Sequence, residues 1–219
     1  MSMNLDAYAT DEDVALTASD DLGTLFPADQ VLASGLDGAF SPADRRTLTS
    51  ASVDFAAAGI ASGHVVRLVG PPEFFRTPGT LLGVSASSSG SLTLRRLGLE
   101  AGAPIAPPEG LTGVEFVSTT LAPQLSQASR ELDRILGLDP PSPGSPPLDA
   151  DASEALRDAV VLLVLARRYA AMAREEGDTF ATRARLFREE FEALVTRLSS
   201  IGSILGPGRA PRPGTRLIR

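Results

Sequence analysis

Two long helical repeats, on either side of a short turn at Glu176-Gly177-Asp178, dominate residues 150–201. Apolar residues recur there at alternating spacings of four and three, which places them on one face of an α-helix. The first run carries mostly small residues and the second mostly large ones, so the sequence predicts two helices packed closely in an antiparallel hairpin. The apolar positions are Ala155, Ala159, Leu162, Ala166, Tyr169 and Ala173, then Phe180, Ala184, Phe187, Phe191, Leu194, Leu198 and Ile201.

Local signals mark the ends of these helices. Asp151 with Glu154 indicates the start of the first, Gly177 a left-handed residue that closes it, and Asp178 or Thr179 the cap of the second. The substitution Phe187→Ala is expected to cost about 3–5 kcal/mol. A third helix with the same spacing is predicted to end at Gly137, and its apolar positions are Leu121, Leu125, Ala128, Leu132 and Ile135.

Between residues 45 and 119 the period changes to the alternation typical of strands. The fold class predicted is therefore α+β: a small α-helical bundle with an inserted antiparallel β-barrel or sandwich and an extended C-terminal arm. The expected parts are an acidic helical segment (1–44), a β-domain (45–119), a helical core (120–201) with a proline-rich connector (139–149), and a basic arm (202–219). The five expected strands are Arg46–Thr49, His64–Val69, Thr80–Val84, Ser91–Arg95 and Val114–Val117.

Composition excludes several classes of site. Cysteine is absent, which rules out disulfides and thiolate metal sites, and all twenty basic residues are arginine. Without lysine the chain cannot form a Walker-A phosphate loop or a Schiff base. No cofactor is expected. The longest apolar run, Ala159–Ala166, is too short to span a bilayer, and no secretory signal opens the sequence, so we expect a soluble protein made in the cytoplasm.

Charge is unevenly distributed along the chain. Residues 1–150 carry eighteen acidic residues and eight arginines, whereas residues 151–219 carry nine and twelve. Asp11, Glu12 and Asp13 favour the start of a short helix, and a second short helix is expected over Ser19–Phe26. The same triplet has the hard oxygen ligands that a divalent cation prefers, but it lacks the further ligands of such a site. Capping and solvation are the interpretation we adopt.

Two other places carry candidate chemistry or contacts. Phe74 and Phe75 lie in a loop bracketed by prolines, where they either plug the core or contact a partner. The lone His64 opens an expected strand, and Gly83–Ser87 resembles a nucleophile elbow without its last glycine, so no triad is indicated. We expect no enzyme.

The C-terminal residues 206–219 are basic and rich in proline and glycine. A segment of this kind is disordered, contacts phosphates along nucleic acid, or docks in extended form on a partner. The apolar pair near the end favours the protein partner. The residues of this candidate arm are Arg209, Arg212, Arg216, Leu217, Ile218 and Arg219.

Taken together, several phrases resemble tailed-bacteriophage head–tail connector proteins, the adaptors that form rings beneath the portal. The resemblance covers most of the chain and involves no catalytic signature. The phrases are Val53-Asp54-Phe55-Ala56-Ala57-Ala58-Gly59-Ile60, Gly63-His64-Val65-Val66, Ala122-Pro123-Gln124-Leu125, Arg167-Arg168-Tyr169 and Phe187-Arg188-Glu189-Glu190-Phe191.

The resemblance implies a virion protein at the capsid–tail junction, in a homo-oligomeric ring that is usually dodecameric. Its partners would be the portal, reached by the C-terminal arm, and a tail-completion or tail-tube protein, with DNA passing through the channel without specific binding. An acidic channel face would repel the DNA backbone; the candidates are Asp11, Glu12, Asp13, Asp20 and Asp21. The alternatives are a nucleic-acid-binding module, which the net charge of −7 disfavours, and a metal-dependent enzyme using Asp11 and Asp13.

Overall fold

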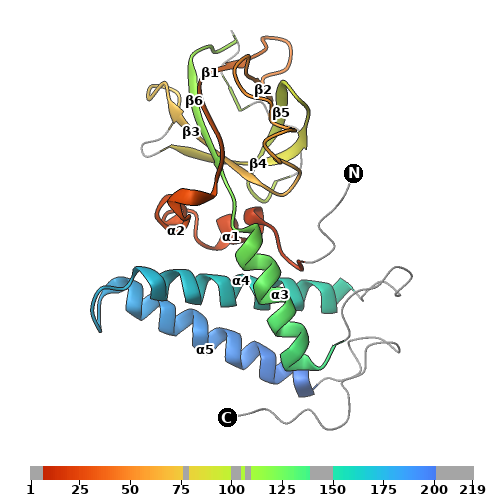
Figure 1. Ribbon diagram of the computed structural model, residues 1–219, viewed down its shortest axis with the longest axis vertical. Helices are drawn as coiled ribbons and strands as arrows, with labels where there is room; N and C mark the ends of the chain where they lie inside the picture. Colours follow the sequence, from red (N-terminus) through yellow and green to blue (C-terminus); the bar gives the residue numbers. More distant parts are fainter. Residues whose placement is uncertain (1–6, 76–78, 100–104, 107–109, 139–149, 201–219) are drawn as a thin grey trace. The chain divides into compact units, whose positions relative to one another are not determined.

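Six antiparallel strands close into a barrel in the computed structural model, in the order β1-β2-β5-β4-β3-β6 (Figure 1). The structure describes residues 7–75, 79–99, 105–106, 110–138 and 150–200. The chain divides into two compact units, one of residues 10–121 and one of residues 1–9 with 122–219. The strands are β1 (Val31–Phe40), β2 (Thr47–Thr49), β3 (Val65–Gly70), β4 (Thr80–Ser87), β5 (Ser91–Arg96) and β6 (Val114–Thr119).

Inward-pointing residues of these strands form the core of the barrel unit. Phe55, from the turn before β3, packs against Phe116 of β6 with ring centroids 5.5 Å apart. Strands β2 to β6 lie where the alternating pattern predicts them, because alternate residues of each strand point into the barrel core. The same unit holds the short helices α1 (Asp11–Thr17), α2 (Leu22–Leu25) and the 3-10 turn η1 (Ala28–Gln30).

Strand β1 is the element that sequence reasoning missed. Gly35 and Gly38 interrupt its alternation and read as turn residues, but they are where β6 comes closest. A Cβ atom on Gly35 would lie 2.7 Å from the ring of Phe116, and one on Gly38 would lie 2.7 Å from the carbonyl oxygen of Val114. Register shifts in the β1–β6 pairing accompany these glycines. The strand therefore requires residues that are poor strand formers.

The second unit contains three long helices: α3 (Ala122–Leu136), α4 (Ala150–Met172) and α5 (Thr179–Ser200). Helices α4 and α5 lie side by side and run in opposite directions (Figure 1). Helix α3 ends at Gly137, whose φ of +68° is accompanied by a hydrogen bond from the Leu138 N–H to the carbonyl of Asp133. Gly177 also has a positive φ but lies in the turn before α5, since α4 already ends at Met172.

The predicted architecture, a helical bundle with an inserted five-stranded domain, is wrong. The barrel is closed and six-stranded and has its own hydrophobic core. The N-terminal helices α1 and α2 belong to this unit and not to a separate helical segment. The physical cause is that β1 lies in the stretch that acidic composition and glycines mark as irregular.

Among the described residues, none of the helices has the length and hydropathy needed to cross a bilayer.

Candidate functional site

Helix α1 fixes the first group of candidate residues against the barrel. Thr10 caps it reciprocally with Asp13: the Asp13 N–H donates to Thr10 Oγ1, and the Thr10 N–H donates to Asp13 Oδ2 at 2.8 Å. The Glu12 N–H donates to the carbonyl of Gly63 at 3.0 Å. These bonds direct Asp11 and Glu12 inward, where their residues are 2% and 5% exposed.

Glu12 forms an ion pair with Arg95, an arginine far away in the sequence. Its Oε2 lies 2.6 Å from Nη2 of Arg95 on β5, and the carboxylate rests over Gly83 of β4. A Cβ atom at Gly83 would lie 2.6 Å from the carboxylate oxygen. A buried carboxylate needs such a partner, so this ion pair secures α1 to the barrel.

Asp11 has no arginine partner in the part of the chain that the structure describes. Its Oδ1 accepts the Leu121 N–H at 2.7 Å, and Nε2 of His64 lies 3.9 Å from its Oδ2. Burial raises the pKa of Asp11 to about 6, against hydrogen bonds from Leu121 and Thr120 that lower it. Burial also lowers the pKa of His64, whose Nδ1 accepts the Ala61 N–H at 2.9 Å. At neutral pH the imidazole therefore carries its proton on Nε2, toward Asp11.

The serines near this cluster are held by backbone carbonyls. Ser85 Oγ donates to Thr93 O at 3.0 Å, and Ser87 Oγ donates to Ile60 O at 2.6 Å. Neither contact presents a nucleophile to His64. Among the described residues, no group of three histidine or acidic side chains is placed to hold a metal ion. The metal alternative for Asp11 and Asp13 therefore has no further ligands there.

The remaining sequence candidates divide between surface and core. Phe75 is 4% exposed and belongs to the barrel core, whereas Phe74 is 50% exposed. Phe75 therefore plugs the core, and a partner contact stays a prediction for Phe74. Asp20 is exposed, and Asp13 and Asp21 are partly exposed. Burial withdraws Asp11 and Glu12 from any channel surface. The arm residues Arg209, Arg212, Arg216, Leu217, Ile218 and Arg219 lie outside the described residues.

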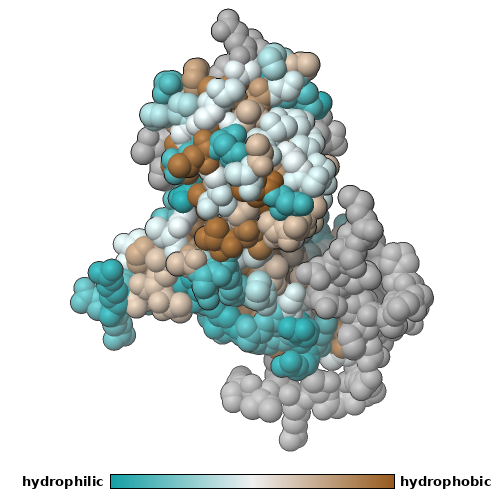
Figure 2. Space-filling view, turned by 45° about the horizontal axis from the view of Figure 1, so that its top comes forward, coloured by the Kyte–Doolittle hydropathy of each residue, from teal (hydrophilic) through white to brown (hydrophobic). Residues whose placement is uncertain are grey.

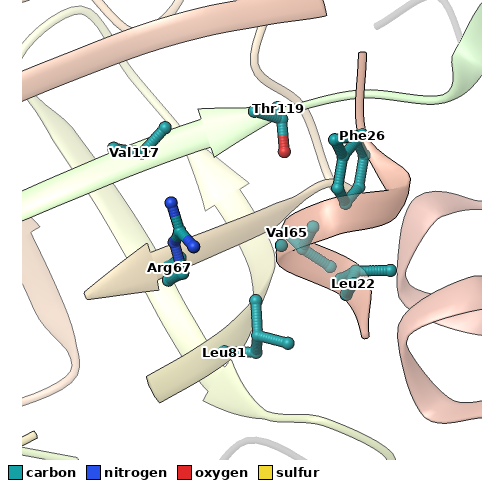
Figure 3. A pocket seen from close by; sticks show the side chains of 8 residues that line it. Leu22, Phe26, Val65, Arg67, Leu81, Val117 and Thr119 are labelled. Atoms are coloured by element: carbon teal, nitrogen blue, oxygen red, sulfur yellow. The ribbon is translucent and has the colours of Figure 1, made fainter. Parts of the chain in front are cut away.

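A small cavity lies on the outer face of the barrel beside α2 (Figure 3). Its volume is about 30 Å³, room for a water molecule or a group of similar size and not for a metabolite. Its lining is mostly apolar, with one cation, Arg67 of β3, and one hydroxyl, Thr119 of β6. Sequence reasoning missed this place, since a lone arginine within an alternating strand resembles any other outward-facing residue.

Helix α5 presents an apolar face that the described part of the chain covers incompletely. Over residues 179–199, the buried side chains are Phe191, Val195 and Leu198. Phe187 stacks on Tyr169 of α4, with ring centroids 5.5 Å apart and an interplanar angle of 13°, yet it stays partly exposed. Leu186 is 50% exposed.

In the space-filling view, small groups of hydrophobic residues lie among hydrophilic and neutral ones on the part of the surface that is not grey (Figure 2). Comparison of the chain with protein-family models, with curated proteins and with solved structures finds no match.

Proposed function

We propose that this protein is a structural component of a tailed-bacteriophage virion, a head–tail connector that forms a homo-oligomeric ring beneath the portal. The proposal starts from the sequence phrases that resemble this family, which span both units of the chain. The ring is expected to be dodecameric, with DNA passing through its channel.

The observation that carries the proposal is the incompletely covered face of α5. A helix of 22 residues that packs on one partner normally buries one continuous apolar stripe. Here Phe180, Phe187 and Leu194 of that stripe stay partly exposed, and Leu186 beside it is half exposed. A neighbouring copy would cover this surface, and burying each large side chain contributes roughly 1–2 kcal/mol.

The uneven charge of the chain supports the assignment of its parts to different partners. The arginine-rich residues 206–219 would dock on an acidic or apolar groove of the portal, whereas Asp13, Asp20 and Asp21 remain available to a channel surface that repels DNA. Phe74 would contact the tail-completion or tail-tube protein.

The experiment is a matched pair of substitutions on α5. Leu186→Glu places a charge beside the incompletely covered stripe, and Thr196→Glu makes the same charge change at another exposed position of the helix. Each variant is mixed with the portal of the same phage, and the assemblies are weighed by mass photometry. We expect multi-copy complexes from wild type and Thr196→Glu, and single copies from Leu186→Glu. Equal assembly by both variants would remove α5 from the interface, and a wild type that never assembles would overturn the proposal.

A further inference from the structure

Arg67 occupies an unusual position on the outer face of the barrel. It lies at the centre of a three-stranded row, opposite Leu81 of β4 on one side and Val117 of β6 on the other. Cross-strand neighbours of an exposed cation are normally acidic or polar, because such pairs stabilise the sheet. This arginine instead has an aliphatic residue on each side (Figure 3).

Two glycines leave the space that the Arg67 side chain fills. A Cβ atom on Gly79, just before β4, would lie 2.7 Å from its Cγ, and one on Gly23 of α2 would lie 2.7 Å from its Nη1. The aliphatic stem therefore runs against one backbone segment and the guanidinium against another. Packing of this kind limits the rotamers of a long side chain and directs its donors to one place.

The Arg67 guanidinium forms no ion pair with the acidic residues that the structure describes. Among the described residues, Arg67 makes no ion pair within 4.0 Å and no side-chain hydrogen bond, and it is partly buried. Arg95, two strands away in the same barrel, shows the usual arrangement with Glu12 at 2.6 Å. A partly buried guanidinium with unused donors favours an anion more strongly than a fully solvated one does.

The cavity beside the guanidinium limits the size of the anion and the kind of molecule that carries it. Leu22 and Phe26, from α2 and the residue after it, form one wall, Leu81 and Val117 lie along the strands, and Thr119 adds a hydroxyl (Figure 3). Its volume of about 30 Å³ admits a small group only. The apolar walls suit a group attached to a chain that contributes hydrophobic contacts of its own.

We propose that Arg67 and this cavity bind a carboxylate side chain of a partner peptide, with an apolar residue of the same peptide packed against the partly exposed Phe26 and Leu81. A guanidinium matches a carboxylate through two parallel hydrogen bonds. Nucleic acid is the less suitable ligand, since binding it requires several cations and this chain carries a net charge of −7. The inference is independent of the connector proposal, because it concerns the barrel unit and any peptide partner.

The test is a selection of random linear peptides on the full-length protein, followed by affinity measurements with one enriched peptide. We expect enriched peptides to carry Asp or Glu next to a large apolar residue. Arg67→Leu should weaken the selected peptide roughly 10- to 100-fold, as should replacing its acidic residue by the amide. The control Arg96→Leu removes the same charge from an exposed position of β5 and should leave affinity unchanged.

Gly23→Ala separates position from charge. The added Cβ would displace the guanidinium of Arg67 without removing its charge, so affinity for the selected peptide should fall. Alanine is also a better helix former than glycine, so α2 should keep its stability, which thermal melting checks. Selected peptides without an acidic residue, or equal affinity for wild type and Arg67→Leu, would overturn the proposal. So would binding of oligothymidine or inorganic phosphate that depends on Arg67 when acidic peptides do not bind.

Discussion

Among single residues, the two buried carboxylates of α1, Asp11 and Glu12, differ in how the fold compensates their charge. Glu12 is held by Arg95, so its charge is balanced, whereas Asp11 is buried beside a histidine that is itself hard to protonate. The sequence predicts a short helix that starts at Asp11, Glu12 and Asp13, because the signals for it are local. It gives no indication that Asp11 and Glu12 point inward, because their partners Leu121 and Arg95 are far away in the chain.

Asp11 should make stability depend on pH. Its folded pKa of about 6 exceeds the ordinary 3.8, so the folded state binds more protons than the unfolded state between these values. Stability from this group therefore rises as pH falls from 7 to about 4, by about 3 kcal/mol. Urea unfolding of wild type and Asp11→Asn should show the wild type gaining relative to the variant over that window. A difference that stays constant with pH would contradict the assignment.

The Glu12–Arg95 pair predicts coupled substitutions. Arg95→Met leaves a buried carboxylate without a partner and should cost about 2–4 kcal/mol, at or below the range for fully buried pairs because Arg95 is one-third exposed. The double variant Glu12→Gln/Arg95→Met should recover much of that loss. Urea unfolding of wild type, the single variants Glu12→Gln and Arg95→Met, and the double variant measures the coupling free energy. Additive costs would show that the two side chains do not interact.

At the scale of elements, periodicity identified the long helices and five strands but not how completely they are covered. Helix α4 is buried on more than one face, so Leu156, Val160 and Leu163 are buried beside the predicted positions. Helix α5 is buried less than its pattern suggests. Spacing shows which residues share a face, and only the packing partners decide how much of that face meets solvent.

The partial exposure of Phe187 changes its expected contribution. It stacks on Tyr169 without being buried, so Phe187→Ala should cost about 2–3 kcal/mol, below the loss expected of a core phenylalanine. Thermal unfolding of the variant, beside Thr196→Ala at an exposed position of the same helix, measures this. A loss no larger than that of Thr196→Ala would show that the ring contact is not formed.

For the molecule as a whole, the sequence indicated an α+β protein but not that residues 10–121 form a closed barrel with a core of its own. Residues 10–121 build a closed barrel that includes the N-terminal helices. Closure depends on β1, and β1 depends on glycines that lie against Phe116 and Val114. Such contacts join distant segments, so local pattern does not reveal them.

The proposed docking of residues 206–219 on the portal can be tested by deletion. Deleting residues 208–219 should leave the thermal melt unchanged and abolish binding to the portal, since the deleted segment carries four arginines and the apolar pair Leu217-Ile218. Cosedimentation with the portal is the measurement. Undiminished binding would show that the arm is not the docking segment.

The most direct measurement of the proposed function is electron microscopy of the full-length protein mixed with the portal of its own phage. The connector proposal predicts an added ring of copies coaxial with the portal, with an open channel wide enough for duplex DNA. Portals that stay bare at protein concentrations well above theirs would contradict the connector function.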